Sequence, residues 1–276
     1  IEANTEIVSL EHLEKDCIIP VFSKDNESTI SHFQFVDKCQ QIIQKLLPGV
    51  LQKTPEIRVS HVVKGRIPSA IGKPAKDLEE HEKTIYYERC AFIIDLPSTK
   101  QIVNGNELTL SIGGVRAYNQ ENLYSKKSME KFKVFIGFKN KVCTNLCIST
   151  DGFSNEIRIS SIHELEDKMI ELFSNYKRDN HLKMMERMIE HKLSETQFAH
   201  LIGKFRMFTH LDKHTQKSIF PISLNDSQIN NIVKDYYQCP NFSRSQDGSI
   251  SFWNLYNLFT EANKSSYIDN NLERNV

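Results

Sequence analysis

The spacing of hydrophobic and polar positions divides the chain into three parts, and the first part has the period of helices. Ser9 can cap a short helix that runs to about Lys15. Ser31 and Gln34 form a capping-box pair at the start of a longer helix, which Pro48–Gly49 ends. The apolar positions of this longer helix share one face: Val36, Cys39, Ile43, Leu46 and Leu47.

Between residues 57 and 161 the period changes to the strict alternation of strands. Residues 90–96 form a near-continuous apolar run, as in a buried strand, and the Asn-Gly-Asn of residues 104–106 is a turn signal. The pattern predicts about six strands joined mostly by short turns, in an antiparallel sheet with one face in water. Residues 66–84 are polar, contain two prolines and are expected to form an exposed loop.

The last part returns to the helical period. Ile162–Lys192 contains neither proline nor glycine and predicts a long helical stretch with a polar break at Arg178–Asn180, and Ser194 and Ser251 can cap two further helices. The sequence shows no internal repeat. We therefore predict an α+β fold with a central antiparallel sheet, an N-terminal helix and a C-terminal helical part. Residues 1–161 would form the mixed segment and sheet, and residues 162–276 a helical part packed on the sheet.

Charge changes this picture only locally. The chain has 35 basic and 35 acidic residues, so its formal net charge is zero, unlike a typical nucleic-acid-binding protein. Residues 57–161 nevertheless hold 16 basic and 11 acidic side chains, a balance of +5. Residues 1–56 hold 5 basic and 9 acidic side chains, and residues 162–276 hold 14 basic and 15 acidic ones. Any binding of nucleic acid would therefore depend on a local surface.

The composition also indicates the cellular compartment in which the protein is expected. Six cysteines form no CxxC pair, and a chain of 276 residues does not need disulfides to be stable. We therefore expect free thiols and a cytoplasmic protein. No apolar run approaches the roughly 18 residues of a membrane span, and no signal peptide is visible, so no membrane partner is expected. The oligomeric state is left open.

The strongest chemical signal is a basic and aromatic stretch from Arg116 to Lys141, with seven basic and two acidic residues. If alternate side chains face water, its cations can follow phosphates while an aromatic ring stacks on a base of a single strand. The alternative is a solvated strand face whose lysines discourage edge pairing. The candidate contacts are Arg116, Lys126, Lys127, Lys131, Lys133, Phe135, Lys139 and Lys141.

Other signals are weaker. His210 and His214 could share a metal only on one helix, and this stretch is more typical of a loop with exposed histidines. Cys143 and Cys147 would lie about 13 Å apart on a strand, too far to share a metal without further ligands. Phosphate-loop and nucleophile-elbow motifs are absent. We therefore predict no catalytic residues, no metal and no cofactor.

The C-terminal sequence carries a resemblance. "YNLFTEANKSSYIDNNLER" (residues 256–274) resembles a run found in an uncharacterised family from plasmids and conjugative elements of Bacteroides-like bacteria, and "LIGKFRMF" and "TISHFQFV" resemble further blocks of it. "GGVRAYNQENLYS" and "VCTNLCIS" are loosely similar to phage- and plasmid-like proteins of unknown function. The resemblance implies a mobile-element setting inside bacteria and no particular activity. The residues of this C-terminal motif are interpreted either as contacts to a phosphate or as structural contacts: Asn257, Asn263, Lys264, Ser265, Ser266, Tyr267, Asp269 and Arg274.

Three hypotheses follow. The first is a non-enzymatic mobile-element protein that binds single-stranded nucleic acid through the basic and aromatic strand face. The second is a protein-interaction or inhibitory module that binds a protein of the host or of the element through the stretch Ile162–Lys192. The third is an enzyme of unfamiliar type, which would require titratable side chains in mutual contact within a pocket.

Overall fold

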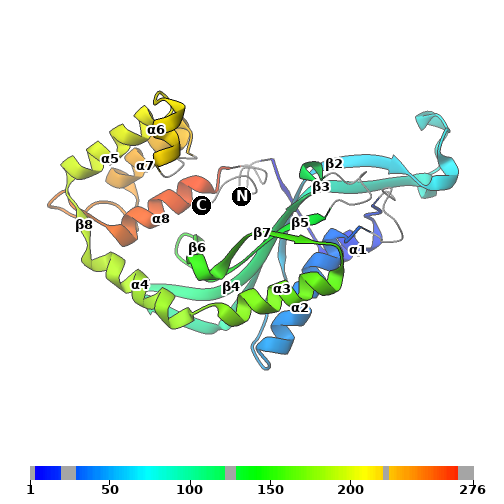
Figure 1. The fold of residues 1–276 in the computed structure, drawn as a ribbon, viewed down its shortest axis with the longest axis horizontal. Coiled ribbons are helices and arrows are strands. Elements are labelled where there is room, and N and C mark those ends of the chain that lie inside the picture. Colours follow the sequence, from blue (N-terminus) through cyan, green and yellow to red (C-terminus); the bar gives the residue numbers. More distant parts are fainter. Residues whose placement is uncertain (1–3, 20–28, 122–128, 220–223, 267–276) are drawn as a thin grey trace.

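A computed structural model describes residues 4–19, 29–121, 129–219 and 224–266. Within these ranges the chain forms a curled antiparallel sheet and a set of helices, which confirms the predicted α+β class. The strand order is β1-β2-β3-β4-β5-β6, and β7 also pairs with β5. Two helices lie along one face of the sheet, and the C-terminal helices gather beyond one of its ends (Figure 1).

The stretches in which hydrophobic and polar residues alternate form strands, as predicted. Asn104 and Gly105 have φ of 48° and 72° and make the tight turn that the Asn-Gly-Asn signal predicts between β3 and β4. The strands are β1 (Glu6–Val8), β2 (Glu56–Arg66), β3 (Lys83–Val103), β4 (Asn106–Ala117), β5 (Glu130–Asn140), β6 (Leu146–Cys147) and β7 (Phe153–Ile159).

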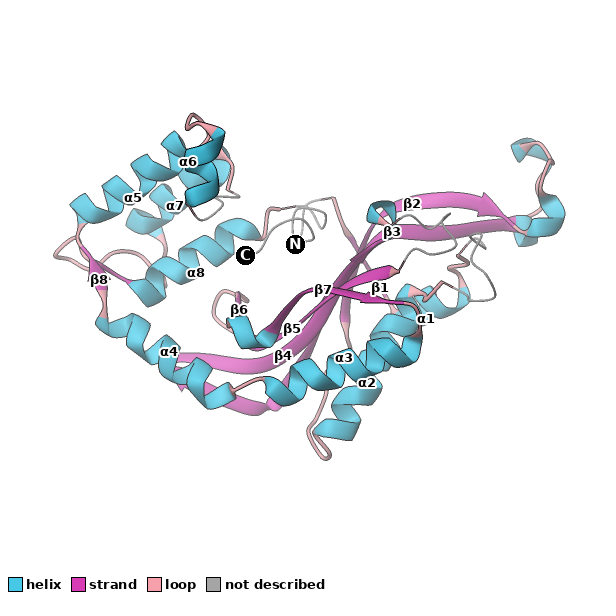
Figure 2. Ribbon diagram, viewed as in Figure 1, coloured by secondary structure: helices cyan, strands magenta, loops and turns pink. Residues whose placement is uncertain are grey.

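The expected exposed loop at 66–84 is smaller than predicted. β2 and β3 continue past the edge of the sheet and pair as far as Arg66 opposite Lys83, so only residues 67–82 remain outside the ladder. These residues form three single turns of 3₁₀ helix. The two strands and this tip project from the body as an arm (Figure 2).

The predicted helix starts are confirmed where a cap residue was identified. The side chains of Ser9, Ser31, Ser194 and Ser251 each accept a hydrogen bond from a backbone N–H in the first turn of their helix. The helices are α1 (Leu10–Lys15), α2 (His32–Leu46), α3 (Ile162–Asn175), α4 (Arg178–Glu190), α5 (Glu195–Phe208), α6 (Lys213–Ser218), α7 (Asp226–Gln238) and α8 (Phe252–Asn263). Among the described residues, none of these helices has the length and apolar character needed to cross a bilayer.

The prediction of one long helical stretch over Ile162–Lys192 is wrong. Tyr176 adopts an extended backbone with ψ of 120°, and Lys177 separates α3 from α4. The carboxylate of Asp151 accepts a hydrogen bond from the Lys177 N–H at 3.0 Å, which stabilises the break. The polar residues at 178–180 lie next to this break, but the partner that stabilises it is 26 residues away and cannot be identified from the periodicity.

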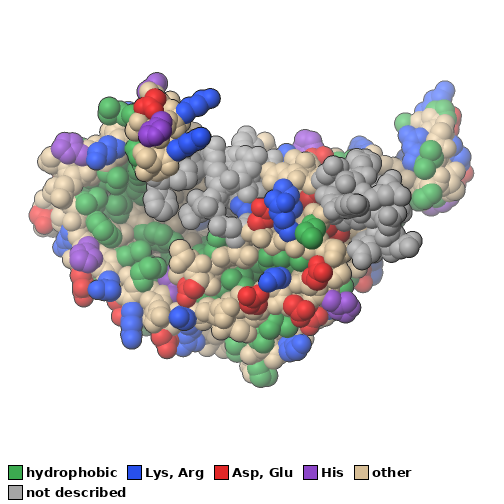
Figure 3. Space-filling model, in the orientation of Figure 1, with side chains coloured by type: hydrophobic (Ala, Val, Ile, Leu, Met, Phe, Trp, Pro, Cys, Tyr) green, Lys and Arg blue, Asp and Glu red, His purple; other side chains and the backbone are tan. Residues whose placement is uncertain are grey.

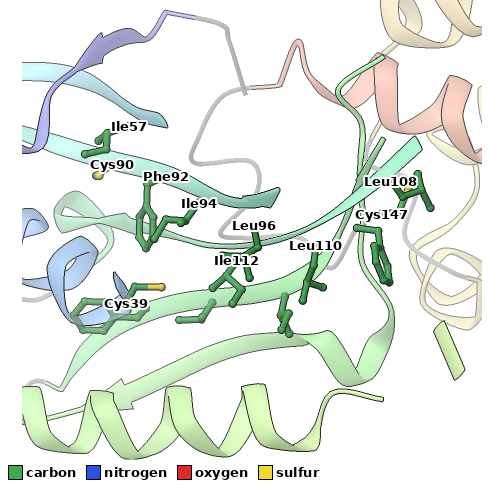
Figure 4. Close-up of a cluster of buried hydrophobic side chains, with 14 of the residues drawn as sticks. Cys39, Ile57, Cys90, Phe92, Ile94, Leu96, Leu108, Leu110, Ile112 and Cys147 are labelled. Atoms are coloured by element: carbon green, nitrogen blue, oxygen red, sulfur yellow. The ribbon is translucent and has the colours of Figure 1, made fainter. Parts of the chain in front are cut away.

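The core forms where α2 and α3 cover one face of the sheet. Phe35 of α2 packs edge-on against Phe92 of β3 and Phe132 of β5, with ring centroids 5.0 and 4.8 Å apart. A Cβ atom at Gly114 of β4 would lie 2.4 Å from the Phe35 ring, so this glycine lets the helix approach the sheet. The buried side chains around Phe92 continue along β3 and β4 toward Cys147 (Figure 4).

Two short strands, β8 (Lys192–Leu193) and β9 (Ile250–Ser251), pair with each other within the C-terminal helical part. α4 packs against α8 and also touches β3, so this part is joined directly to the sheet. α3, in contrast, packs against α2 and β7. The division of the chain at residue 161 stays a prediction.

Candidate nucleic-acid interface

The predicted strand face is not a solvent-exposed platform. On β5, Lys133 is 6% exposed and Phe135 is 8% exposed, so the expectation that they lie together in water is wrong. The Phe135 ring lies over Gly113 of β4, where a Cβ atom would come within 2.5 Å of it. It also packs with Ala91 and Val115 in a small apolar cluster. An aromatic ring that is buried in this way cannot stack on a base.

The other lysines predicted for this face have acidic neighbours. Lys126 and Lys127 lie outside the described residues. The remaining three each form an ion pair: Lys131 with Glu156, Lys139 with Asp95, and Lys141 with Glu107. The Lys139 pair has an Nζ–Oδ2 distance of 3.2 Å and is mostly buried. These carboxylates neutralise the positive charge that the sequence pattern indicated.

Arg116 lies inside the protein rather than on its surface. Its side chain is fully buried, and its Nε donates to Glu121 Oε1 at 3.1 Å while its other nitrogens reach Glu130 and the carbonyl of Ile30. Glu130 also accepts a hydrogen bond from the Ile30 N–H at 3.1 Å. Burial raises the pKa of Glu121, and the Arg116 guanidinium opposes that rise. The network fixes the chain just before α2, so Arg116 serves the fold.

One cluster brings titratable side chains into contact near the N-terminus. His12 of α1 approaches Asp16 through Nδ1 at 2.8 Å and the Tyr87 hydroxyl through Nε2 at 3.1 Å. The order carboxylate–imidazole–hydroxyl is that of a proton relay. However, burial and the nearby Glu6 carboxylate raise the pKa of Tyr87 to about 12, which disfavours a tyrosinate nucleophile at neutral pH. The contacts instead hold α1 against β3.

The described residues of the C-terminal motif form structural contacts, beginning with Asn257 of α8. Its side chain is fully buried, and its Oδ1 accepts from Asn140 Nδ2 at 3.1 Å while its Nδ2 donates to the Trp253 carbonyl at 2.9 Å. The backbone carbonyl of Asn257 accepts from Asn145 Nδ2 at 2.9 Å. Trp253 Nε1 in turn donates to Asn106 Oδ1 at 3.0 Å. We call these five residues the asparagine clamp, because they join α8 to the ends of β4 and β5.

Lys264 follows α8 and extends the same contact. Its ammonium group donates to the Cys143 carbonyl and to Thr144 Oγ1 at 3.0 Å, both in the turn between β5 and β6. It also pairs with Glu261 at 2.6 Å. With three partners inside the protein, the charge of Lys264 is already used in docking α8.

The two serines of the motif bind α7. Gln228 Nε2 donates to Ser265 Oγ at 3.2 Å and to Ser266 Oγ at 2.9 Å. Ser266 Oγ also donates to Asn263 Oδ1 at 2.9 Å. These bonds tie the end of α8 to the start of α7, while a phosphate contact by the motif stays a prediction. Three motif residues lie outside the described part of the chain: Tyr267, Asp269 and Arg274.

The structure reveals a basic surface that the sequence analysis missed. Between residues 196 and 219 there are four cationic side chains and one acidic one, Asp212. Asp212 caps α6, accepting from the N–H groups of His214 and Thr215 at 3.0 and 2.9 Å. We call the exposed side chains here the α5–α6 surface: His200, Lys204, Arg206, His210, Lys213, His214 and Lys217.

The cations of this surface differ from those of β5 in their partners. In the described part of the chain, Lys204, Lys213 and Lys217 have no carboxylate partner, and Arg206 donates to the amide oxygen of Asn230. Lysine, arginine and histidine side chains gather over α5 and α6 with few acidic side chains between them (Figure 3). The last third of the sequence as a whole contains 15 acidic and 14 basic residues, so its total charge gives no sign of this local excess.

The structure also clarifies the predicted histidine pair. His210 precedes α6 and His214 lies in its first turn, so the two are not presented by one continuous helix. Among the residues that the structure describes, no group of three or more His, Cys, Asp or Glu side chains is arranged to hold a metal ion.

The chain as a whole, residues 1–276, matches the family described as "Domain of unknown function, B. Theta Gene description (DUF3871)", and it belongs to that family. No curated protein and no solved structure matches it.

Proposed function

We propose that this member of the DUF3871 family binds nucleic acid through the α5–α6 surface. The observation that carries the proposal is the contrast in charge pairing. Lys131, Lys139 and Lys141 each have a carboxylate partner, whereas the cations on α5 and α6 have none among the described residues. An ammonium group without an acidic neighbour keeps its full attraction for a phosphate.

The expected mode is contact with the phosphate backbone. Lysines neutralise phosphates and release condensed counterions, so the affinity falls as salt concentration rises. For three lysines in contact, the slope of log K against log salt should be about −2 to −3. Non-specific binding of this kind has a dissociation constant of roughly 10⁻⁴–10⁻⁶ M at physiological salt. Among the described residues of α5 and α6 no phenylalanine, tyrosine or tryptophan is exposed, and phosphate contacts do not depend on the base, so we expect little preference among bases.

We infer a setting in bacterial plasmids or conjugative elements and in a reducing cytoplasm. The resemblance of the C-terminal motif supports the first part. The second is supported by the six cysteines, all of which are free thiols.

The test is fluorescence anisotropy with labelled single-stranded and double-stranded oligonucleotides at about 50 and 200 mM salt. In the test variant three lysines of the surface become glutamate: Lys204→Glu, Lys213→Glu and Lys217→Glu. The control variant reverses the same number of charges on exposed lysines of other helices: Lys15→Glu, Lys168→Glu and Lys183→Glu.

We expect the test variant to bind at least about tenfold more weakly at low salt, and the control to stay within about threefold of the original protein. Equal weakening of both variants would show that only the overall charge matters. Absence of binding by the original protein at low salt would refute the proposal outright.

A second candidate is binding of an acidic protein at the same place. It is favoured by Met207 and Ile219, which are 62% and 44% exposed at the edge of the cationic side chains. A flexible methionine beside lysines suits an acidic amphipathic helix. Replacing Met207 by serine would weaken such a complex, whereas it would leave phosphate binding unchanged.

A further inference from the structure

The C-terminal helical part contains a structural repeat that the sequence did not show. α4, β8 and α5 form one helix–strand–helix unit, and α7, β9 and α8 form a second. In both units a serine, Ser194 or Ser251, caps the helix that follows the strand. The two strands pair antiparallel, with Leu193 directly opposite Ile250. The units are therefore joined at equivalent positions.

The packing of the helices obeys the same symmetry. α4 packs against α8, and α5 packs against α7. Exchanging the first unit with the second turns one of these contacts into the other, as a two-fold axis between β8 and β9 requires. Phe198 of α5 stacks on Tyr236 of α7 with ring centroids 4.1 Å apart, and Phe205 meets Phe259 edge-on at 5.4 Å.

The second unit has the spacing of a calcium-binding EF-hand loop. In that loop of twelve residues, ligands come from positions 1, 3, 5, 7, 9 and 12, and position 6 is a glycine in a sharp turn. With Gly248 as position 6, its φ of 81° fits that turn and Ile250 falls at position 8, in the strand. The residues at the ligand positions are then Ser243, Ser245, Asp247, Ser249, Ser251 and Asn254.

The donor set is too weakly charged for calcium. Asp247 is the single carboxylate among the six positions, and position 12 carries Asn254 where calcium loops have a bidentate glutamate. Protein groups make the connections that a cation would otherwise make. Asn254 Nδ2 donates to the Ser243 carbonyl at 3.2 Å, which joins position 12 to position 1. The Ser249 N–H and hydroxyl both donate to Asp247 Oδ1, at 2.9 and 2.7 Å.

We propose that residues 178–263 form an EF-hand-type pair whose second loop keeps the glycine turn and the short strand of a calcium loop but is closed by the Asn254–Ser243 hydrogen bond instead of a cation. The first unit has no such loop, because α4 extends to Glu190 and leaves four residues before α5. The arrangement of α7 and α8 is then independent of calcium. This inference does not rest on the proposed binding of nucleic acid.

The test is to restore the missing carboxylates. A triple variant carries Ser243→Asp, Ser245→Asp and Asn254→Glu, so that positions 1, 3, 5 and 12 are all acidic. Calcium and magnesium are titrated into this variant and into the original protein by calorimetry, and thermal unfolding is measured with and without about 1 mM of each ion. We expect the variant to bind one calcium ion with a dissociation constant of roughly 10⁻⁴ M or tighter, and magnesium at least about tenfold more weakly.

A matched control places three carboxylates around the same loop at exposed positions that are not ligands: Gln238→Glu, Asn241→Asp and Gln246→Glu. We expect no calcium binding by this control. The inference would be overturned if calcium stabilised the original protein against thermal unfolding. It would also be overturned if the triple variant folded but bound no calcium. If the triple variant does not fold, the smaller double change Ser245→Asp with Asn254→Asp decides, with weak calcium binding expected and none overturning the inference.

Discussion

Removal of the Asn257 side chain tests whether the asparagine clamp holds the C-terminal helices on the sheet. The substitution is Asn257→Ala, which leaves the α8 backbone suited to a helix. The side chain is fully buried and takes part in hydrogen bonds with Asn140 and the Trp253 carbonyl.

The magnitude follows from the partners that remain. Asn140 is fully buried and loses the acceptor of its Nδ2, which costs about 1–3 kcal/mol for an unsatisfied buried donor. Asn145 keeps the backbone carbonyl of Asn257 at 2.9 Å and adds little to the loss. The small cavity adds about 1 kcal/mol, so the expected destabilisation is about 2–4 kcal/mol. That is a large share of the roughly 5–15 kcal/mol by which a protein of this kind is stable.

Trp253 makes the measurement direct. It is the one tryptophan of the sequence and is fully buried at the clamp, so its fluorescence reports on this contact as urea is added. The matched control is Asn231→Ala, an exposed asparagine on α7, which should change stability by no more than about 0.5 kcal/mol. A loss at Asn257 no larger than that of the control would refute the role assigned to the clamp.

Three further predictions concern buried groups. Burial lowers the pKa of His181 to about 4, so the unfolded chain takes up this proton at a higher pH than the folded protein does. As pH falls from about 6.5 toward 4, the free energy of unfolding should therefore drop by up to about 1.4 kcal/mol per pH unit. In urea unfolding, His181→Gln should reduce this dependence on pH. Arg116→Met leaves two buried carboxylates without their cation and should cost about 3–5 kcal/mol in the same assay, or abolish soluble expression. Cys39, Cys90 and Cys147 are fully buried, and burial raises the pKa of each thiol, so mass spectrometry after brief alkylation of the native protein should find them unmodified.

Local rules made the secondary structure predictable. The caps at Ser31 and Ser194 depend on a partner three residues away, so the sequence contains all the information that the contact needs. The turn at Asn104–Gly105 is local in the same way, because it requires only residues that tolerate positive φ.

The exposure of a strand face could not be predicted, because it depends on residues far along the chain. Phe135 is buried partly because Gly113, on the neighbouring strand, leaves room for its ring. Lys141 is paired with Glu107, 34 residues away. Alternation indicates which side chains share a face of a strand, but it does not say which face is covered or which charges are matched.

The repeat of helix–strand–helix units could not be predicted from the sequence for a related reason. The two units share a serine cap and apolar positions facing inward, but few identical residues, so neither unit resembles the other as a string of letters. Their equivalence becomes visible in the pairing of Leu193 with Ile250. The α5–α6 surface was hidden by averaging, since its excess of positive charge is offset by acidic residues elsewhere in the same third of the chain.

Lys264 decides between the two readings of the C-terminal motif. Its ammonium group donates to Thr144 Oγ1 at 3.0 Å and pairs with Glu261 at 2.6 Å, which favours docking of α8 over contact with a ligand. Lys264→Met keeps the length of the side chain and removes the charge. If the role is docking, the urea midpoint falls by the equivalent of about 1–2 kcal/mol and the affinity for an oligonucleotide is unchanged. If Lys264 instead binds phosphate, stability changes little, affinity falls, and the salt slope decreases by about one.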